Sequence, residues 1–242
     1  MSPLPSSADL DADNGAFRSP APSSASRLPP KPSENQRFSG RVRFVAGLDP
    51  HVVHCESILE WKAALVLLAM PDALDIFEQP PAVEYVDQHG EIHHHTFDFM
   101  LHLRDGTRLA IMVKPAEIAA RKGIYDLVKL IALQVSMDFA DGVLLITDED
   151  CDRDTVHDAV LIDDMRRHDD PEADAAVRGI VADLVGEPTI QCLVDATGLG
   201  PRAFGAVVRL IGDGVLQVMN SRRIRHGARV RRTGAPFRDS PP

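Results

Sequence analysis

Two alternating segments joined by Asp105-Gly106 constrain the fold of this chain more than any other feature. In the segment His93–Leu103 every second residue from Phe97 onward is a large apolar one, and Leu109, Ile111 and Val113 alternate in the same way between Arg108 and Lys114. A period of two is typical of strands that bury one face, and an Asp-Gly pair between two such runs is a strong hairpin signal. The sequence therefore predicts a β-hairpin over residues 93–114.

The flanking segments place this hairpin in a larger domain of helices and strands. Apolar spacing predicts four helices, over His54–Ala69, Ile124–Phe139, Asp152–Arg167 and Glu172–Val185. Three more strands are expected at Arg41–Val45, Ala82–Asp87 and Gly142–Thr147. The last of these is wholly apolar, which favours a sheet covered on both faces. This order of elements predicts an α/β (α+β) core with one mixed sheet.

Composition divides the 242-residue chain into five regions. Residues 1–39 contain seven prolines and no periodic apolar pattern, so we expect a disordered N-terminal tail. The main domain is predicted over 40–150, a helical connector over 151–186, a small second domain over 187–233 and a disordered tail over 234–242. The sequence has no signal-like N-terminus and no run of about 18 apolar residues, so we expect a cytoplasmic protein without a membrane partner.

Charge and cysteine content narrow the possible functions. The net charge is -10, yet residues 201–242 hold nine arginines and only two acids. Such asymmetry indicates an anionic partner at the C-terminal end, with a solvated basic tail as the alternative. Cys55, Cys151 and Cys192 lie far apart and form no CxxC pair, which argues against a zinc site.

Three charged positions stand out within the predicted main domain. Glu56 and Glu60 are four residues apart and are expected to share a helix face. Asp98 interrupts an apolar strand, and Lys114 ends the next one. A charge on a half-buried strand is costly unless it is paired or solvated. One interpretation is a plain Asp–Lys pair at the rim of the sheet. The other is a phosphodiester-cutting site, where acids hold Mg²⁺ and a lysine orients the attacking water.

The stretches ESILEW and FEQPPAVEYVDQHGEIHHHTFDFMLHLRDGTRLAIMVKPAE resemble the TnsA-type transposon endonucleases, which have a restriction-endonuclease-like fold. That family shows a Ser-Leu-Glu helix motif, then EQP, a PDF strand and an EVK-like strand end. The resemblance covers roughly residues 52–150. It implies that Glu60, Asp98 and Lys114 are catalytic. It also implies that Asp98, Glu60 and the Val113 carbonyl hold Mg²⁺ or Mn²⁺, with Glu56 as a second choice for Glu60.

Two departures from the family pattern leave the activity open. Phe97 replaces the usual proline, and Met112 stands where the family has an acid or amide. A thioether is a soft ligand that does not hold a hard ion such as Mg²⁺. One hypothesis is a metal-dependent DNA endonuclease that nicks strands at transposon ends beside a separate transposase. The other is a catalytically weak or inactive nuclease-fold subunit for DNA binding or assembly. A transcription regulator is a weaker third.

The run His93-His94-His95 permits a transition-metal site, although a polar strand near phosphate is the favoured interpretation.

The hairpin loop decides whether Asp98 and Lys114 can meet. A two-residue loop would pair Asp98 with Val113 and put the two charges on opposite faces. A three-residue loop, with Gly106 as the left-handed residue of a bulge, pairs Asp98 with Met112 and puts them on one face. A nuclease site therefore requires the longer loop, with Glu60 reaching in from the helix.

The C-terminal region has the pattern of a winged helix-turn-helix. A helix over Pro188–Ala196, a turn over 197–200 and a helix from Pro201 to Ile211 precede a ribbon of Val215–Val218 and Ile224–Val230. The arginines predicted to bind nucleic acid, mainly through phosphates, are Arg202, Arg209, Arg222, Arg223, Arg225, Arg229, Arg231 and Arg232. The expected partners are double-stranded DNA, the transposase and transposition regulator proteins. A protein-docking module is the alternative.

Overall fold

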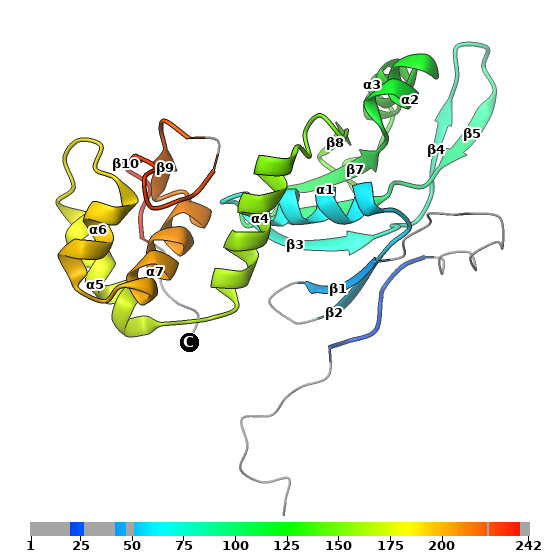
Figure 1. Ribbon diagram of the computed structural model, residues 1–242. Coiled ribbons are helices and arrows are strands. Elements are labelled where there is room, and N and C mark those ends of the chain that lie inside the picture. Colours follow the sequence, from blue (N-terminus) through cyan, green and yellow to red (C-terminus); the bar gives the residue numbers. More distant parts are fainter. Residues whose placement is uncertain (1–19, 27–41, 47–50, 222, 238–242) are drawn as a thin grey trace, which may run out of the picture.

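A four-stranded mixed sheet forms the centre of the first domain in this computed structural model, which describes residues 20–26, 42–46, 51–221 and 223–237 (Figure 1). Its strands, in spatial order, are β3 (Ala73–Glu78), β6 (Phe99–Leu103), β7 (Arg108–Val113) and β8 (Gly142–Ile146). The first three are antiparallel, and β8 runs parallel to β7. The predicted core of helices around a mixed sheet is thus confirmed.

The β6–β7 hairpin has the three-residue loop that the site requires. Leu103 donates its N–H to the carbonyl of Thr107 (2.8 Å), which leaves residues 104–106 as the loop. Gly106 has φ 91°, a left-handed value that a glycine adopts without steric cost. Phe99 pairs with Ile111, so Asp98 comes next to Met112 one step beyond the paired strands. The prediction of the longer loop is confirmed.

Alternating residues of the hairpin supply two separate hydrophobic cores. On one face Phe99, Leu101, Ile111 and Val113 pack with α1 (Ile58–Leu68), and Val156 of α4 (Arg153–Arg166) joins them. On the opposite face α3 (Ile124–Ala132) packs against the sheet, and α2 (Ala116–Arg121) lies beside α3 (Figure 1). The core on that face holds Phe97, Met100, Ala110, Met112 and Ile131. Strands β6 and β7 are therefore covered on both faces, whereas the apolar strand β8 at the edge of the sheet holds no buried residue and leaves Leu144 exposed.

Several predicted element boundaries were wrong. The expected strand over 93–103 is broken at residues 96–98 into β5 (Ile92–His95) and β6, and β5 pairs with β4 (Val83–Val86) in a separate arm. The first helix begins at Ile58 rather than His54, because His51–Cys55 forms β2, which pairs with β1 (Val42–Ala46). Strand β3 and helix α2 were not predicted.

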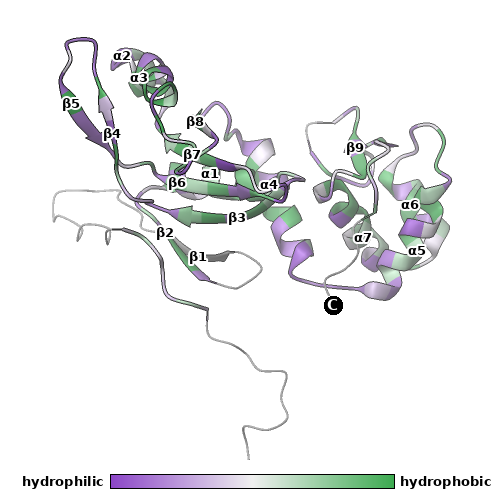
Figure 2. Ribbon diagram, turned by 180° about the vertical axis from the view of Figure 1, so that it is seen from behind, coloured by the Kyte–Doolittle hydropathy of each residue, from purple (hydrophilic) through white to green (hydrophobic). Residues whose placement is uncertain are grey.

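The C-terminal elements share one hydrophobic cluster. They are α5 (Pro171–Ala182), α6 (Ile190–Thr197), α7 (Pro201–Gly212), β9 (Leu216–Val218) and β10 (Val230–Arg232). Their apolar faces point inward (Figure 2). A helix, a turn, a second helix and a two-stranded ribbon follow one another as predicted, but the second strand of the ribbon is Val230–Arg232 and not the expected Ile224–Val230. Helix α5, expected within a connector, packs against α6 and α7 in this cluster.

Helix α4 joins the two cores. Its residue Ile162 belongs to the C-terminal cluster, and a Cβ on Gly212 of α7 would lie only 2.6 Å from the Ile162 side chain. Arg166 of α4 donates to the carbonyl of Leu68 (2.7 Å) and also to that of Gly212. A glycine is therefore required at 212 for the two helices to approach this closely.

Parts of both predicted tails are described and contact the domains. Ala21 pairs with His51, and Ser26 donates its N–H to the carbonyl of Gln79 (3.0 Å). Phe237 lies under the guanidinium of Arg232, 5.3 Å from the ring centroid. Disorder predicted for residues 20–26 and 234–237 does not fit these contacts, and the rest of both tails lies outside the described residues. Among the described helices, none combines the length and apolar character needed to span a membrane.

Candidate active site

Asp98 and Lys114 meet at the end of the central sheet. The Nζ of Lys114 lies 3.0 Å from Oδ2 of Asp98 and 2.8 Å from the carbonyl oxygen of Val113. The same Oδ2 accepts the Val113 backbone N–H at 2.7 Å. The side chain of Asp98 is 18 % exposed and that of Lys114 36 % exposed, so solvent reaches both. The predicted placement of these two residues on one side of the hairpin is confirmed.

Glu60 lies near this pair but also caps its own helix. Ser57 is the N-cap of α1 and accepts the N–H of Glu60, while Oε1 of Glu60 accepts the Ser57 hydroxyl (3.0 Å). The arrangement is related to a capping box, but the Glu60 carboxylate accepts the Glu56 N–H (2.5 Å) in place of the Ser57 N–H. Burial raises the pKa of Glu60, and the charge of Asp98 raises it further. The two carboxylates are therefore within electrostatic range of each other.

Glu56 does not occupy the position expected from the sequence. It precedes α1 rather than sharing a helix face with Glu60, because the helix begins only at Ile58. Its backbone N–H donates to Oε2 of Glu60 (2.5 Å), and its own Oε1 accepts the side-chain amide of Gln79 (2.7 Å). Glu56 thus supports Glu60 through its main chain.

A buried acid that sequence reasoning did not select lies beside these residues. Glu78, at the end of β3, is 2 % exposed. Its Oε1 accepts the Ser23 hydroxyl, whereas the buried Oε2 has no hydrogen-bond partner among the described residues. Burial, with the charges of Glu60 and Glu78, raises the pKa of Cys55 far above its usual range, so this cysteine remains a thiol. The EQP sequence was the signal that could have identified Glu78 and Gln79.

His95 approaches the site from the β4–β5 arm. Its ring meets Phe97 edge-on with centroids 4.9 Å apart. Burial lowers its pKa, while the charges of Asp98 and Lys114 act on it in opposite directions. Within the described part of the chain, no three His, Cys, Asp or Glu side chains are grouped closely enough to hold a metal ion. The transition-metal interpretation of the histidine run therefore has no supporting group of ligands among these residues.

Met112 is fully buried in the core that α3 covers. Its neighbours there include Phe97, Met100 and Ala110. The position that carries an acid or amide in the resembled family is thus an apolar packing position in this chain. An oxygen donor at residue 112 would have to be accommodated inside that core.

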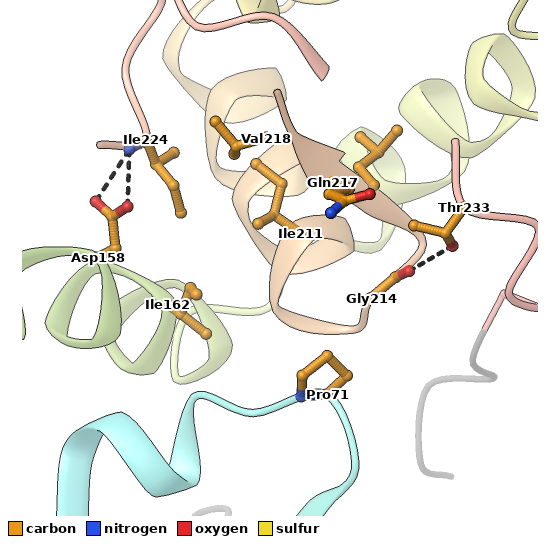
Figure 3. A pocket seen from close by; sticks show the side chains of 10 residues that line it. Pro71, Asp158, Ile162, Ile211, Gly214, Gln217, Val218, Ile224 and Thr233 are labelled. Atoms are coloured by element: carbon orange, nitrogen blue, oxygen red, sulfur yellow. Dashed lines mark hydrogen bonds between the residues drawn. The ribbon is translucent and has the colours of Figure 1, made fainter. Parts of the chain in front are cut away.

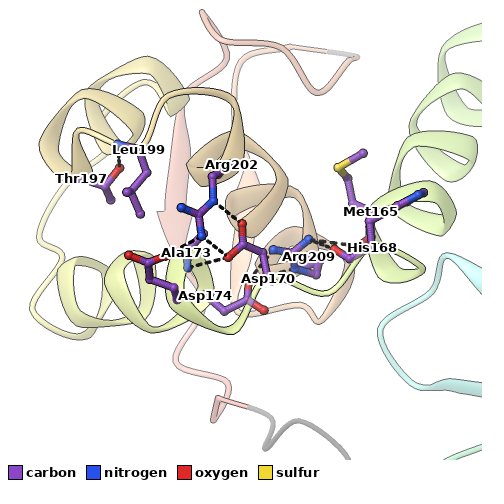
Figure 4. Close-up of polar contacts among 10 residues, drawn as sticks. Met165, His168, Asp170, Ala173, Asp174, Thr197, Leu199, Arg202 and Arg209 are labelled. Carbon is purple, nitrogen blue, oxygen red and sulfur yellow. Dashed lines mark hydrogen bonds and ion pairs between the residues drawn. The ribbon is translucent and has the colours of Figure 1, made fainter. Parts of the chain in front are cut away.

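Two of the predicted DNA-contacting arginines are engaged within the protein (Figure 4). Arg209 is 9 % exposed, pairs with Asp174 at 2.7 Å and donates to the carbonyls of Met165 and His168. Such burial does not fit a DNA-contacting role. Arg202 pairs with Glu172 and Asp170, and its hydrogen bonds lower the pKa of Asp170 to about 2.

The ribbon arginines are partly engaged as well. Arg223 pairs with Asp154 at 2.5 Å, and Arg231 lies 4.0 Å from Glu187. Arg229 donates to the carbonyl of Glu187 (3.0 Å) and Arg232 to that of Ala182 (2.5 Å). Arg225 is exposed and forms no ion pair with any described residue, and the predicted role of Arg222 lies outside the described residues. The number of arginines in this region therefore overstates the positive charge that is available to a partner.

An apolar groove of about 500 Å³ lies where the C-terminal elements meet α4 (Figure 3). Ile162, Ile211, Val218 and Ile224 line it, and Asp158 at its edge accepts the backbone N–H of Ile224 (3.0 Å).

The chain matches no protein-family model and no curated protein sequence.

Proposed function

We propose that this protein is a metal-dependent DNA endonuclease whose site is formed by Glu60, Asp98 and Lys114. The observation that carries the proposal is the contact of Lys114 Nζ with Asp98 Oδ2 at a solvent-reached end of the sheet, with Glu60 in electrostatic range. An acid pair and a lysine are the groups that hydrolysis of a phosphodiester needs.

The donor set suits a hard divalent ion. Asp98, Glu60 and the carbonyl of Val113 would hold Mg²⁺ or Mn²⁺, which commonly take one or two carboxylates and keep several waters. The bound ion would lower the pKa of a water molecule and stabilise developing negative charge. The charges of Asp98 and Glu56 both act on Glu60, and negative charge of this kind attracts a cation.

The protein's own groups would prepare the reaction. Lys114 is held between Asp98 and the Val113 carbonyl, so its ammonium is already oriented at the site. From there it would orient the attacking water and offset charge on the phosphate. The backbone N–H of Val113 fixes the Asp98 carboxylate. These contacts reduce the reorganisation that catalysis would otherwise require.

The resemblance to the TnsA-type family extends the proposal to its substrate and partners. We infer a restriction-endonuclease-like fold with a C-terminal winged helix, acting in the cytoplasm on double-stranded DNA at transposon ends. A separate transposase and transposition regulators would act beside it. The three-residue hairpin loop and the helix, turn, helix and ribbon support this inference.

A nuclease-fold assembly subunit with little or no activity is the second candidate. The observation favouring it is Met112, which is fully buried among apolar side chains where the family has an acid or amide. Under this hypothesis Asp98 and Lys114 would be only a structural ion pair.

Calorimetric titration with Mn²⁺ distinguishes the two candidates. The endonuclease proposal expects binding by the wild type and a loss of about tenfold or more in affinity for Glu60→Gln, because a carboxylate ligand is removed. Ser57→Ala is the matched control, since it disturbs the same helix cap without removing an oxygen charge. Equal affinity in wild type and Glu60→Gln would contradict the role of Glu60 in the proposal.

A further inference from the structure

Gln79 has an unusual backbone conformation at a buried position. It follows β3, is 5 % exposed and has φ 44°, the only positive φ of a non-glycine residue in the described part of the chain. The next residue is Pro80, which itself restricts the conformation of Gln79. A strained backbone of this kind persists only where its surroundings hold it.

Hydrogen bonds link Gln79 directly to the main chain of Asp98 and, through Glu56, to Glu60. Its backbone N–H donates to the carbonyl of Asp98 (2.9 Å). Its side-chain amide donates to Glu56 (2.7 Å), and the N–H of Glu56 donates to Glu60 (2.5 Å). A continuous chain of contacts therefore runs from Asp98 through Gln79 and Glu56 to Glu60.

We propose that Gln79 is a positioning residue that fixes Glu60 relative to Asp98. This inference rests on the proposed endonuclease function. The left-handed backbone directs the N–H of Gln79 toward β6 while its amide reaches back to Glu56 at the start of α1. Contacts with groups that support metal ligands typically change affinity or activity by about 10- to 100-fold when removed.

The amide suits this position because it donates without carrying charge. A lysine or arginine at 79 would satisfy Glu56 but would neutralise acids that are needed to attract a cation. A carboxylate at 79 would face the Glu56 carboxylate at hydrogen-bond distance, and the two like charges would repel.

A side-chain exchange tests the positioning role. Gln79→Glu should lower kcat for plasmid nicking and the affinity for Mn²⁺ by about 10- to 100-fold, with an unchanged KM for DNA. The double variant Glu56→Gln/Gln79→Glu restores an amide–carboxylate contact at the same net charge. It should recover most of both properties. A double variant as impaired as Gln79→Glu would overturn the proposal, because the Glu56 carboxylate would then act directly.

Hydrogen exchange provides a measurement without metal or substrate. Gln79→Gly removes the amide and relieves the positive φ, so we expect unchanged or higher thermal stability together with faster exchange at the Glu56 N–H. Unchanged exchange at that N–H would overturn the positioning role whatever the activity. A wild type that neither nicks DNA nor binds Mn²⁺ would instead refute the endonuclease function. Equal nicking by wild type and Gln79→Glu would refute only the positioning role.

Discussion

The sheet end and the C-terminal elements of this protein differ in how their charged side chains are paired. At the sheet end, Lys114 pairs with Asp98, burial and the charge of Asp98 raise the pKa of Glu60, and the buried Oε2 of Glu78 has no hydrogen-bond partner among the described residues. In the C-terminal elements, arginines pair with acids from other parts of the chain, as Arg209 does with Asp174 and Arg223 with Asp154. The arginine-rich C-terminal region, whose charge is the more conspicuous in the sequence, therefore has more of its charge paired within the protein.

This difference teaches that a count of charges does not locate a binding site. Arg202, Arg209, Arg223 and Arg231 form ion pairs within the protein, so part of the basic charge is balanced before any partner arrives. At the sheet end, Lys114 balances Asp98, whereas burial raises the pKa of Glu60, and a buried charge is costly unless an ion or a shifted pKa compensates it. We therefore expect substitutions in the C-terminal region to change mainly stability, and those at the sheet end to change mainly ion binding.

The largest effect on stability is expected for Arg209→Ala. The substitution leaves Asp174 buried without its partner, and breaking a buried pair in this way typically costs about 3–5 kcal/mol. The free energy of unfolding, measured by denaturant titration, would show the loss. Arg202→Ala is the control, since its pairs are solvent-exposed and its effect should be far smaller. Similar losses for both variants would contradict the structural role assigned to Arg209.

Met112→Glu should also destabilise the protein, by about 2 kcal/mol or more, because it places a carboxylate in an apolar core. From the sequence alone, the expectation for the same substitution concerns metal affinity: a new oxygen donor at residue 112 should strengthen metal binding. Met112→Leu, which conserves volume, should cost less than about 1.5 kcal/mol. A Met112→Glu protein that is as stable as wild type and binds Mn²⁺ more tightly would show that residue 112 reaches the site.

Ser57→Ala should lower the free energy of unfolding by about 1 kcal/mol, since it removes the N-cap of α1.

The effect of Glu60→Gln on stability should depend on pH. Because burial raises the pKa of Glu60, the folded state favours the protonated acid, and the stability this provides is lost as pH rises through that pKa. The substitution should therefore be better tolerated at pH 8 than at pH 4 in thermal unfolding. A pH-independent difference would indicate that Glu60 is not strained by burial.

The smallest effect is expected in weak DNA binding by the ribbon. With Arg223 paired to Asp154, Arg225→Ala should flatten the slope of log affinity against log salt by at most about 0.9, one phosphate contact. Fluorescence anisotropy across a salt series would measure this change. A reduction of two units or more in the triple substitution of Arg222, Arg223 and Arg225 would show that the internal ion pair opens on DNA.

The sequence predicted the parts of the fold that local chemistry determines. Asp105-Gly106 and the alternation around it specified the hairpin, and the site chemistry selected the three-residue loop that brings Asp98 to Lys114. The C-terminal helices followed from apolar spacing, with Pro201 opening α7 and Thr189 capping α6.

The remaining features depend on contacts that local patterns do not contain. The start of α1 was misplaced because residues 51–55 pair with β1, and no local signal excluded a longer helix. Strand β3 went unnoticed because its burial is interrupted at a register shift between Ala73 and Asp75. The pairing of Arg209 with Asp174 joins residues 35 positions apart in sequence, so the arginine count could not reveal it.

Plasmid nicking with Mg²⁺ or Mn²⁺ tests the central claim most directly. The account predicts metal-dependent nicking by the wild type and a loss of at least about 100-fold in Asp98→Asn, which keeps the size of the side chain while removing its charge. Arg167→Ala, which removes an exposed ion pair with Asp163 and touches no proposed site residue, should retain full nicking in the same assay. Nicking that persists in Asp98→Asn, or its absence from the wild type with either metal, would contradict the endonuclease account.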